Sequence, residues 1–211
     1  HLTSGIEADY LSEFTSLHGT EGKAHITTEV LPQHLTLDER DVEQLGTRLK
    51  MNPPIRYQKD KETLWKRLYD GTIACIATDH APHTLEAKAK GFPSAPSGMP
   101  GVETSLPVML THASRGACTI EQVVKWMAGN VAEIYGMVGK GRLEEGYDGD
   151  VTLVDMTTER IVDDANTWTT VRWSPFHGKK LVGWPTLTVV GGVPVFERNE
   201  KTGPKGSILV D

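Results

Sequence analysis

Hydrophobic and polar positions in the first half of the chain follow two different periods. Between Gly5 and Leu17, apolar residues recur at helical spacing, which predicts a helix with one apolar face. The β-rich segments at residues 24–31 and 73–78 predict strands, and residues 60–69 between them predict another amphipathic helix. Strand, helix and strand joined by short connections are typical of βα units, so we expect an α/β fold with a parallel sheet.

The middle of the chain adds loops and further helices. Helical segments are also predicted at residues 38–49, 103–114 and 119–135. Thr119 followed by Gln122 fits a capping box at the start of the last of these. Residues 51–54 contain two consecutive prolines and must form a loop, because neither proline has an N–H to donate. Residues 91–101, rich in Gly, Pro and Ser, predict a long loop of the kind that covers a substrate.

The pattern changes near residues 137–146, where we place a domain boundary. We expect one domain at residues 1–138 and a small β-rich domain at residues 139–211. Short β-type segments are predicted there at residues 150–154, 170–173, 187–190, 193–196 and 207–210. Gly191-Gly192 between two of these segments predicts a hairpin turn.

Composition narrows the class of protein. The chain has 211 residues and a formal net charge of −6, which argues against partners such as nucleic acid or an anionic membrane. No apolar run approaches the roughly 20 residues that span a bilayer. The two cysteines make no disulfide framework, so we expect a reducing, cytoplasmic location. Because the chain begins with His rather than Met, we expect it to be the remainder of a longer protein.

The strongest chemical signal lies at the end of the second predicted strand. Asp79, His80 and His83 follow residues 73–78, and the carboxyl ends of parallel strands are where α/β folds hold metals and substrates. Carboxylate and imidazole groups bind divalent metals, and a carboxylate there can also act as general acid or base. The alternative is an Asp that caps the next helix beside two surface histidines.

Other candidates are weaker when taken alone. His1 is a terminal residue, although it precedes an amphipathic helix as the end of a strand would. His34 follows the predicted strand at residues 24–31 and is a candidate to line a site or to support a metal ligand. Asn52, on the proline-rich loop, has a side-chain amide suited to a carboxylate, although asparagine is also common in turns.

Seven segments occur in an order that resembles one family. They are His-Leu-Thr-Ser at 1–4, Glu-Val-Leu-Pro-Gln-His-Leu at 29–35, Lys-Met-Asn-Pro-Pro at 50–54, Asp-Gly-Thr-Ile at 70–73, Thr-Asp-His-Ala-Pro-His-Thr at 78–84, Gly-Val-Glu-Thr at 101–104 and Ser-Pro-Phe-His-Gly at 174–178. Together they resemble the dihydroorotases of the amidohydrolase superfamily, over nearly the whole chain. Thr-Asp-His-Ala-Pro-His is the most specific of them.

The resemblance implies the C-terminal part of a (β/α)₈ metal-dependent hydrolase barrel, with strands six to eight, and a small β-sandwich domain. It also implies one or two zinc ions and the reversible cyclisation of N-carbamoyl-L-aspartate to L-dihydroorotate in pyrimidine biosynthesis. By the same resemblance, His1 and Asp79 are metal ligands and Asp79 is also catalytic. Asn52, His83 and the backbone of Gly98 bind the substrate.

Several features of the family are absent from these residues. The chain contains no His-x-His pair, and the bridging Lys or Asp of the fourth strand and the His of the fifth strand are missing. Only His1 and Asp79 remain as metal ligands, whereas a catalytic zinc usually has about three from the protein. We therefore expect these residues alone to be inactive, and expect a complementing N-terminal half, a homo-oligomer or aspartate transcarbamoylase as partners.

Two other functions remain open at this point. An allantoinase or hydantoinase would share the fold and the aspartate at the strand end, although Asn52 and His83 favour an anionic substrate. A non-catalytic dihydroorotase-like subunit that scaffolds aspartate transcarbamoylase is the second alternative. Such a scaffold has no need of Asp79, His83 and Asn52, and a plain β-rich interaction module would leave the same residues unexplained.

Overall fold

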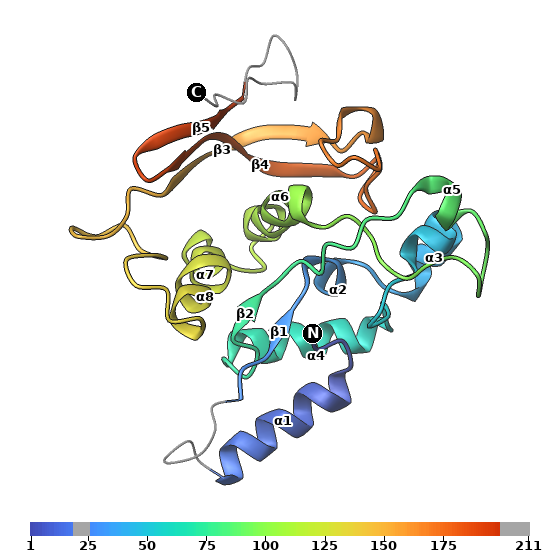
Figure 1. The fold of residues 1–211 in the computed structure, drawn as a ribbon. Helices are drawn as coiled ribbons and strands as arrows, with labels where there is room; N and C mark the ends of the chain where they lie inside the picture. The colour runs from blue at the N-terminus through green and yellow to red at the C-terminus, as the bar shows by residue number, and fades with distance from the viewer. Residues whose placement is uncertain (19–25, 199–211) are drawn as a thin grey trace. The chain divides into compact units, whose positions relative to one another are not determined.

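The computed structural model describes residues 1–18 and 26–198 (Figure 1). Contacts between residues divide the chain into two compact units, His1–Val102 and Glu103–Asp211. This division differs from the expected boundary at residues 138 and 139, because the helices after Val102 make their contacts with the second unit. The domain assignment made from the sequence stays a prediction.

Unit 1 is built on two short parallel strands. Strand β1, Glu29–Val30, pairs with β2, Cys75–Ile76, so that Glu29 lies opposite Cys75. The first residues of the chain lie along the other side of β1, where the Leu2 N–H donates to the Glu29 carbonyl at 2.8 Å. Three neighbouring segments therefore run side by side, and their ends carry His1 and the residues that follow β2.

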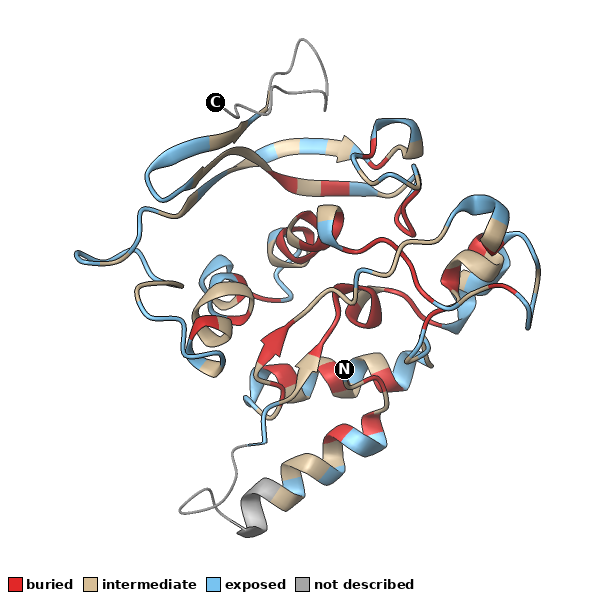
Figure 2. Ribbon diagram, viewed as in Figure 1, coloured by how far each residue is buried: buried red, intermediate tan, exposed pale blue. Residues whose placement is uncertain are grey.

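The parallel pairing is confirmed, but both strands are shorter than expected. Of the predicted strands at residues 24–31 and 73–78, only two residues each are paired as strands, and residues 24 and 25 lie outside the described ranges. Burial explains the sequence signal, since Val30, Leu31 and Ile73 are all fully buried. Figure 2 shows buried residues, in red, on both β1 and β2. The apolar pattern therefore marked the core of unit 1 rather than the extent of strand pairing.

Helices surround these strands. They are α1 (Gly5–His18), α2 (Pro32–Thr36), α3 (Val42–Leu45), α4 (Gln58–Tyr69) and α5 (Leu85–Lys88), with 3₁₀ turns at Glu39–Asp41 and Gly46–Leu49. The two long helices match the predicted ones at residues 5–17 and 60–69. Helix α4 buries Leu64 and Leu68, four residues apart on one face. Its buried Asp60 accepts the Gly5 N–H at 2.8 Å, which ties the first turn of α1 to α4.

Unit 2 contains helices and an antiparallel sheet. The helical elements are α6 (Val102–Ser114), α7 (Ile120–Val124), a π-helical turn (Lys125–Gly129), α8 (Asn130–Ile134) and a 3₁₀ turn (Asp164–Asn166). The strands are β3 (Val151–Ile161), β4 (Lys180–Val190) and β5 (Val193–Glu197), in the order β3-β4-β5. The capping box of Thr119 and Gln122 is confirmed. So is the hairpin at Gly191-Gly192.

One predicted strand in unit 2 is wrong. Residues 170 and 171 form a turn and residues 172 and 173 are irregular, because Arg172 adopts a φ of 52° in the left-handed region, which a strand does not allow. The Arg172 guanidinium donates to the Thr167 carbonyl at 2.7 Å and closes this turn. The segment predicted at residues 207–210 lies outside the described residues. Among the helices of the described ranges, none is long and apolar enough to cross a membrane.

Candidate functional site

Two predicted ligands, His1 and Asp79, meet at the ends of the strands of unit 1. The His1 Nε2 atom lies 3.6 Å from the Asp79 Oδ1 atom. The two side chains remain 28% and 24% exposed, so both are accessible from solvent. His1 enters from the segment beside β1, and Asp79 follows β2. The structure therefore brings together an imidazole and a carboxylate that are 78 positions apart in the sequence.

A third side chain orients the imidazole. The Glu29 carboxylate, at the start of β1, lies 2.6 Å from the Nδ1 atom of His1. A carboxylate at this distance favours a proton on Nδ1, which leaves the Nε2 lone pair directed toward Asp79. Metal-binding histidines commonly have such a carboxylate on their second nitrogen. Glu29 was not assigned a role from the sequence, where it is a charged residue inside a β-type segment and the first residue of the resembling segment at 29–35.

The backbone turns sharply where β2 reaches Asp79. Asp79 has a φ of 45°, a left-handed conformation that Asp and Asn tolerate better than most residues other than Gly. The preceding carbonyl, of Thr78, accepts a 2.9 Å hydrogen bond from the side chain of Gln33, which is buried in α2. The position of the carboxylate is thus held by the end of β2 and by α2 together.

His80, considered above as a candidate metal-binding residue, binds backbone N–H groups in the structure. Its Nδ1 atom accepts the backbone N–H groups of Gly101 at 3.1 Å and Val102 at 3.3 Å. Residue 80 also forms an isolated parallel bridge with Met99. His80 therefore anchors the return of the 91–101 loop through its Nδ1 atom.

His83 and Gly98 lie on two loop segments that touch. The His83 Nε2 atom is 3.0 Å from the carbonyl oxygen of Ser97. Gly98 has a φ of 129°, and a Cβ atom at this position would lie 2.5 Å from the Ala81 carbonyl oxygen. Only glycine fits this close approach. Residues 91–101 form no helix and no strand of their own, as expected for a loop.

Asn52 lies on a loop that the buried side chain of His34 contacts. Its own side chain is exposed, and the next carbonyl, of Pro53, lies 3.2 Å from the Nε2 atom of His34. His34 is only 3% exposed, and this burial lowers its pKa to about 4. A neutral His34 therefore donates to Pro53 at neutral pH. His34 was expected either to line the site or to support it, and the contact with Pro53 is a supporting one.

The donor set fits part of a zinc site. Imidazole nitrogen and carboxylate oxygen are ligands that zinc accepts, and the His1 Nε2 atom lies 3.6 Å from Asp79. Within residues 1–18 and 26–198, no group of three or more His, Cys, Asp or Glu side chains is gathered in a way that could hold a metal ion. These residues would thus supply two ligands of a metal site that needs others.

Comparison with known proteins places the chain in a family. Residues 7–195 match the Amidohydrolase family. A dihydroorotase of Halalkalibacterium halodurans is 45% identical over 176 residues, which are 83% of this chain and 41% of that protein. A dihydroorotase of Geobacillus thermodenitrificans is 42% identical over 174 residues, 82% of this chain and 40% of that protein. The chain thus spans about two fifths of the length of these curated relatives.

Solved structures that resemble the chain are named hydantoinases. The L-hydantoinase (dihydropyrimidinase) from Arthrobacter aurescens matches 100% of this chain and 45% of its own, with a TM-score of 0.89 and 31% identity. A D-hydantoinase from Thermus sp. matches 98% of this chain and 45% of its own, with a TM-score of 0.86 and 23% identity, and supports the fold alone. An α/β metal-dependent hydrolase fold agrees with both, and the chain belongs to the Amidohydrolase family.

Proposed function

We propose that the chain carries part of a dihydroorotase, which closes N-carbamoyl-L-aspartate to L-dihydroorotate and opens it again. In this proposal, β1 and β2 are the seventh and eighth strands of a (β/α)₈ barrel, and His1 ends the sixth. Strands β3 to β5 belong to a small β-sandwich domain. The high identity to curated dihydroorotases supports this reading over other members of the family.

One observation carries the proposal. The His1 Nε2 atom and the Asp79 Oδ1 atom face each other at 3.6 Å, while Glu29 occupies the other nitrogen of the imidazole. In this class of fold the chemistry takes place at the ends of neighbouring parallel segments, and the pair lies at such ends. A bound zinc ion would supply Lewis-acid polarisation of the ring amide carbonyl.

Asp79 is proposed to carry the proton. During ring opening, the Asp79 carboxylate accepts a proton from the attacking water and delivers it to the departing ring nitrogen. Ring closure reverses these steps, so the same carboxylate takes the proton from the ureido nitrogen. A carboxylate that is a quarter exposed and fixed by the turn after β2 has both the access and the orientation for this transfer.

The substrate carboxylate is proposed to lie between the loops of Asn52 and His83, whose side chains orient it. Gly98 contributes through its backbone. Its N–H donates to the Lys50 carbonyl at 3.0 Å and its carbonyl accepts from the Lys88 ammonium at 2.8 Å, so both of its backbone groups are held in place.

Two metal ligands are too few for a catalytic zinc, so we expect activity only when further ligands join the site. A complementing N-terminal half would supply them. Assembly as a homo-oligomer or with aspartate transcarbamoylase, and a cytoplasmic location, stay predictions. The substrate is proposed to be a small molecule, as the names of the curated and solved relatives suggest.

Substrate comparison tests the proposal. The complete, zinc-loaded enzyme is expected to turn over dihydroorotate with a kcat/KM at least about a hundredfold above that for hydantoin or allantoin, because only dihydroorotate has a carboxylate for Asn52 and His83. Preference for hydantoin would contradict it and favour the second candidate, a hydantoinase, which the 31% identity and 0.89 TM-score to an L-hydantoinase support. Loss of all three activities in the metal-loaded complete enzyme would favour a scaffolding subunit.

A further inference from the structure

Lys88 is a fully buried lysine whose ammonium group contacts three backbone carbonyl groups. It ends helix α5 and is 1% exposed. Its ammonium nitrogen lies 2.7 Å from the carbonyl oxygen of Lys50, 3.0 Å from that of Pro96 and 2.8 Å from that of Gly98. Burial of a lysine is unfavourable unless its donors are satisfied, and here three N–H groups meet three acceptors.

These carbonyls come from the two loops that carry the proposed substrate contacts. Lys50 lies two residues before Asn52, whereas Pro96 and Gly98 belong to the 91–101 loop. The Gly98 N–H returns a 3.0 Å hydrogen bond to the Lys50 carbonyl. Lys88 and Gly98 therefore both bind the same oxygen and join the two loops at one point.

The form of Lys88 that makes these bonds is charged at neutral pH. Burial, and to a smaller extent the nearby Lys50, lower the pKa of Lys88 to about 8. The lysine is then still mostly protonated at pH 7. Lys50 itself donates to the carbonyls of Pro93 at 2.5 Å and Ala95 at 2.6 Å, so it holds the earlier part of the same loop.

We propose that Lys88 is a positioning residue of the substrate site, which fixes the distance between the Asn52 loop and the Gly98–Ser97 backbone. This rests on the proposed function for the identity of the substrate. Lys88 does not touch substrate. Its ammonium fixes the Gly98 carbonyl and, next to it, Ser97, whose carbonyl contacts His83. Asn52 and His83 are therefore in position before the substrate carboxylate binds.

Replacement of Lys88 by methionine tests the proposal, because methionine keeps an apolar stem and lacks the donors. The matched control is Lys90→Met, which changes an exposed lysine on the same stretch of chain. In the chain itself, hydrogen exchange of the Gly98 and Ala81 amides is expected to be about tenfold faster in Lys88→Met than in Lys90→Met. Exchange of the Ala77 amide, which donates to Val30 beside β2, is expected to be unchanged.

Kinetics separates positioning from a merely structural role. In the complete, metal-loaded enzyme, Lys88→Met is expected to raise the KM for dihydroorotate about tenfold and to change kcat much less, whereas loss of folded enzyme would lower kcat at constant KM. If Lys88→Met does not fold, Lys88→Gln replaces it, with two N–H donors in place of three and an intermediate effect on both readouts.

Each outcome decides the question. Faster exchange at Gly98 together with a higher KM supports the proposal. Equal exchange at Gly98 in folded Lys88 and Lys90 variants overturns it, and so does faster exchange with an unchanged KM. Because the exchange measurement needs no turnover, failure of the wild-type enzyme to act on dihydroorotate would count against the proposed function and not against the loop anchor.

Discussion

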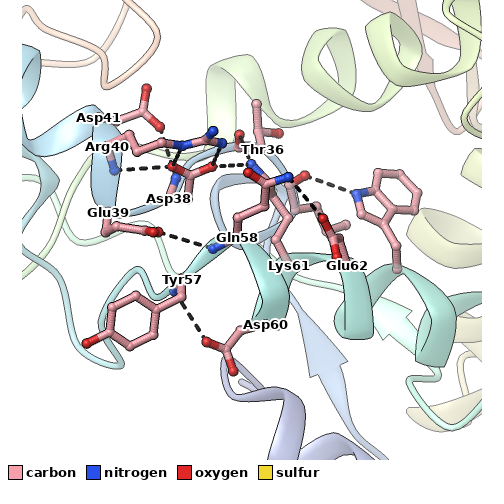
Figure 3. Close-up of polar contacts among 12 residues, drawn as sticks. Thr36, Asp38, Glu39, Arg40, Asp41, Tyr57, Gln58, Asp60, Lys61 and Glu62 are labelled. Carbon is pink, nitrogen blue, oxygen red and sulfur yellow. Dashed lines mark hydrogen bonds and ion pairs between the residues drawn. The ribbon is translucent and has the colours of Figure 1, made fainter.

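Two aspartates of unit 1 show how a carboxylate used for structure differs from one available for chemistry. Asp38 is 3% exposed and accepts hydrogen bonds from the Arg40 side chain at 2.6 and 2.7 Å and from Lys61 at 2.6 Å (Figure 3). Asp79 is 24% exposed, and the Nε2 atom of its neighbour His1 lies at the longer distance of 3.6 Å. Both carboxylates face cationic or potentially cationic groups, but only one is enclosed by them.

The two carboxylates differ in how far their oxygen atoms are already hydrogen-bonded. The Arg40 guanidinium, which is the main cause, and Lys61 hold the pKa of Asp38 well below its usual range, so this carboxylate stays ionised. Both of its oxygens are already occupied, and it also caps the 3₁₀ turn at Glu39–Asp41 through the Arg40 N–H at 3.1 Å. Asp79 keeps an open side toward solvent. Availability, rather than charge, therefore identifies the carboxylate suited to bind a metal or move a proton.

The largest effect is expected for Asp79→Asn. Asparagine tolerates the left-handed backbone at this position but can neither accept the proton nor bind zinc as an anion. In the complete enzyme, kcat for dihydroorotate should fall about a thousandfold, with little change in thermal stability. Steady-state kinetics and a melting curve check this. A folded Asp79→Asn variant with more than about a tenth of normal kcat would remove Asp79 from the mechanism.

Asp38→Asn should produce the opposite pattern. The substitution leaves the mostly buried Lys61 without its anion and weakens the cap of the 3₁₀ turn, so we expect the free energy of unfolding to fall by about 3 kcal/mol. Urea denaturation measures this change. The control Glu43→Gln, at an exposed position on α3, should stay within about 0.5 kcal/mol of wild type. Equal stability of the two variants would contradict the structural role given to Asp38.

Acid should weaken unit 1 through His34. The pKa of His34 is about 4 in the folded chain, against 6.5 for an unperturbed histidine, because burial disfavours the imidazolium. Between these values protons bind only to the unfolded chain, so stability is full above pH 6.5 and is lost as pH falls toward 4. At pH 5 the loss attributable to His34 should be about 2 kcal/mol. Urea denaturation at pH 7 and pH 5 measures it.

His34→Gln is the control for this pH dependence, since its amide can still donate to the Pro53 carbonyl but does not titrate. The difference in stability between pH 7 and pH 5 should shrink in this variant by about the same 2 kcal/mol. An unchanged difference would show that other groups cause the acid sensitivity.

The sequence predicted helices and strand ends better than it predicted hydrogen bonds between residues far apart in the chain. Helices α1 and α4 followed from apolar spacing. The strand-end rule pointed to Asp79, whereas the pairing of His1 with Asp79 came from the resemblance to dihydroorotases. Residues 170–173 were mistaken for a strand because β-branched residues can also occupy turns. Lys88 gave no signal, since its acceptor on Lys50 is 38 positions away and the need for its charge arises only after folding.

The smallest of these effects is expected for Glu29→Gln. Glutamine keeps an oxygen near the Nδ1 atom of His1 but loses the charge that favours the proton there. Because Glu29 acts on the site only through His1, zinc affinity and kcat/KM should each fall about tenfold, far less than for Asp79→Asn.

Chelator competition and steady-state kinetics measure the two quantities for Glu29→Gln, with the exposed Glu86→Gln as control. A fall in kcat/KM without weaker zinc binding would mean that Glu29 acts on the substrate rather than on the imidazole. No fall in either would mean that the 2.6 Å contact with His1 leaves the function of the site unchanged. His1 would then resemble Asp38, a residue whose contacts serve the fold, and Asp79 alone would connect this edge of the sheet to chemistry.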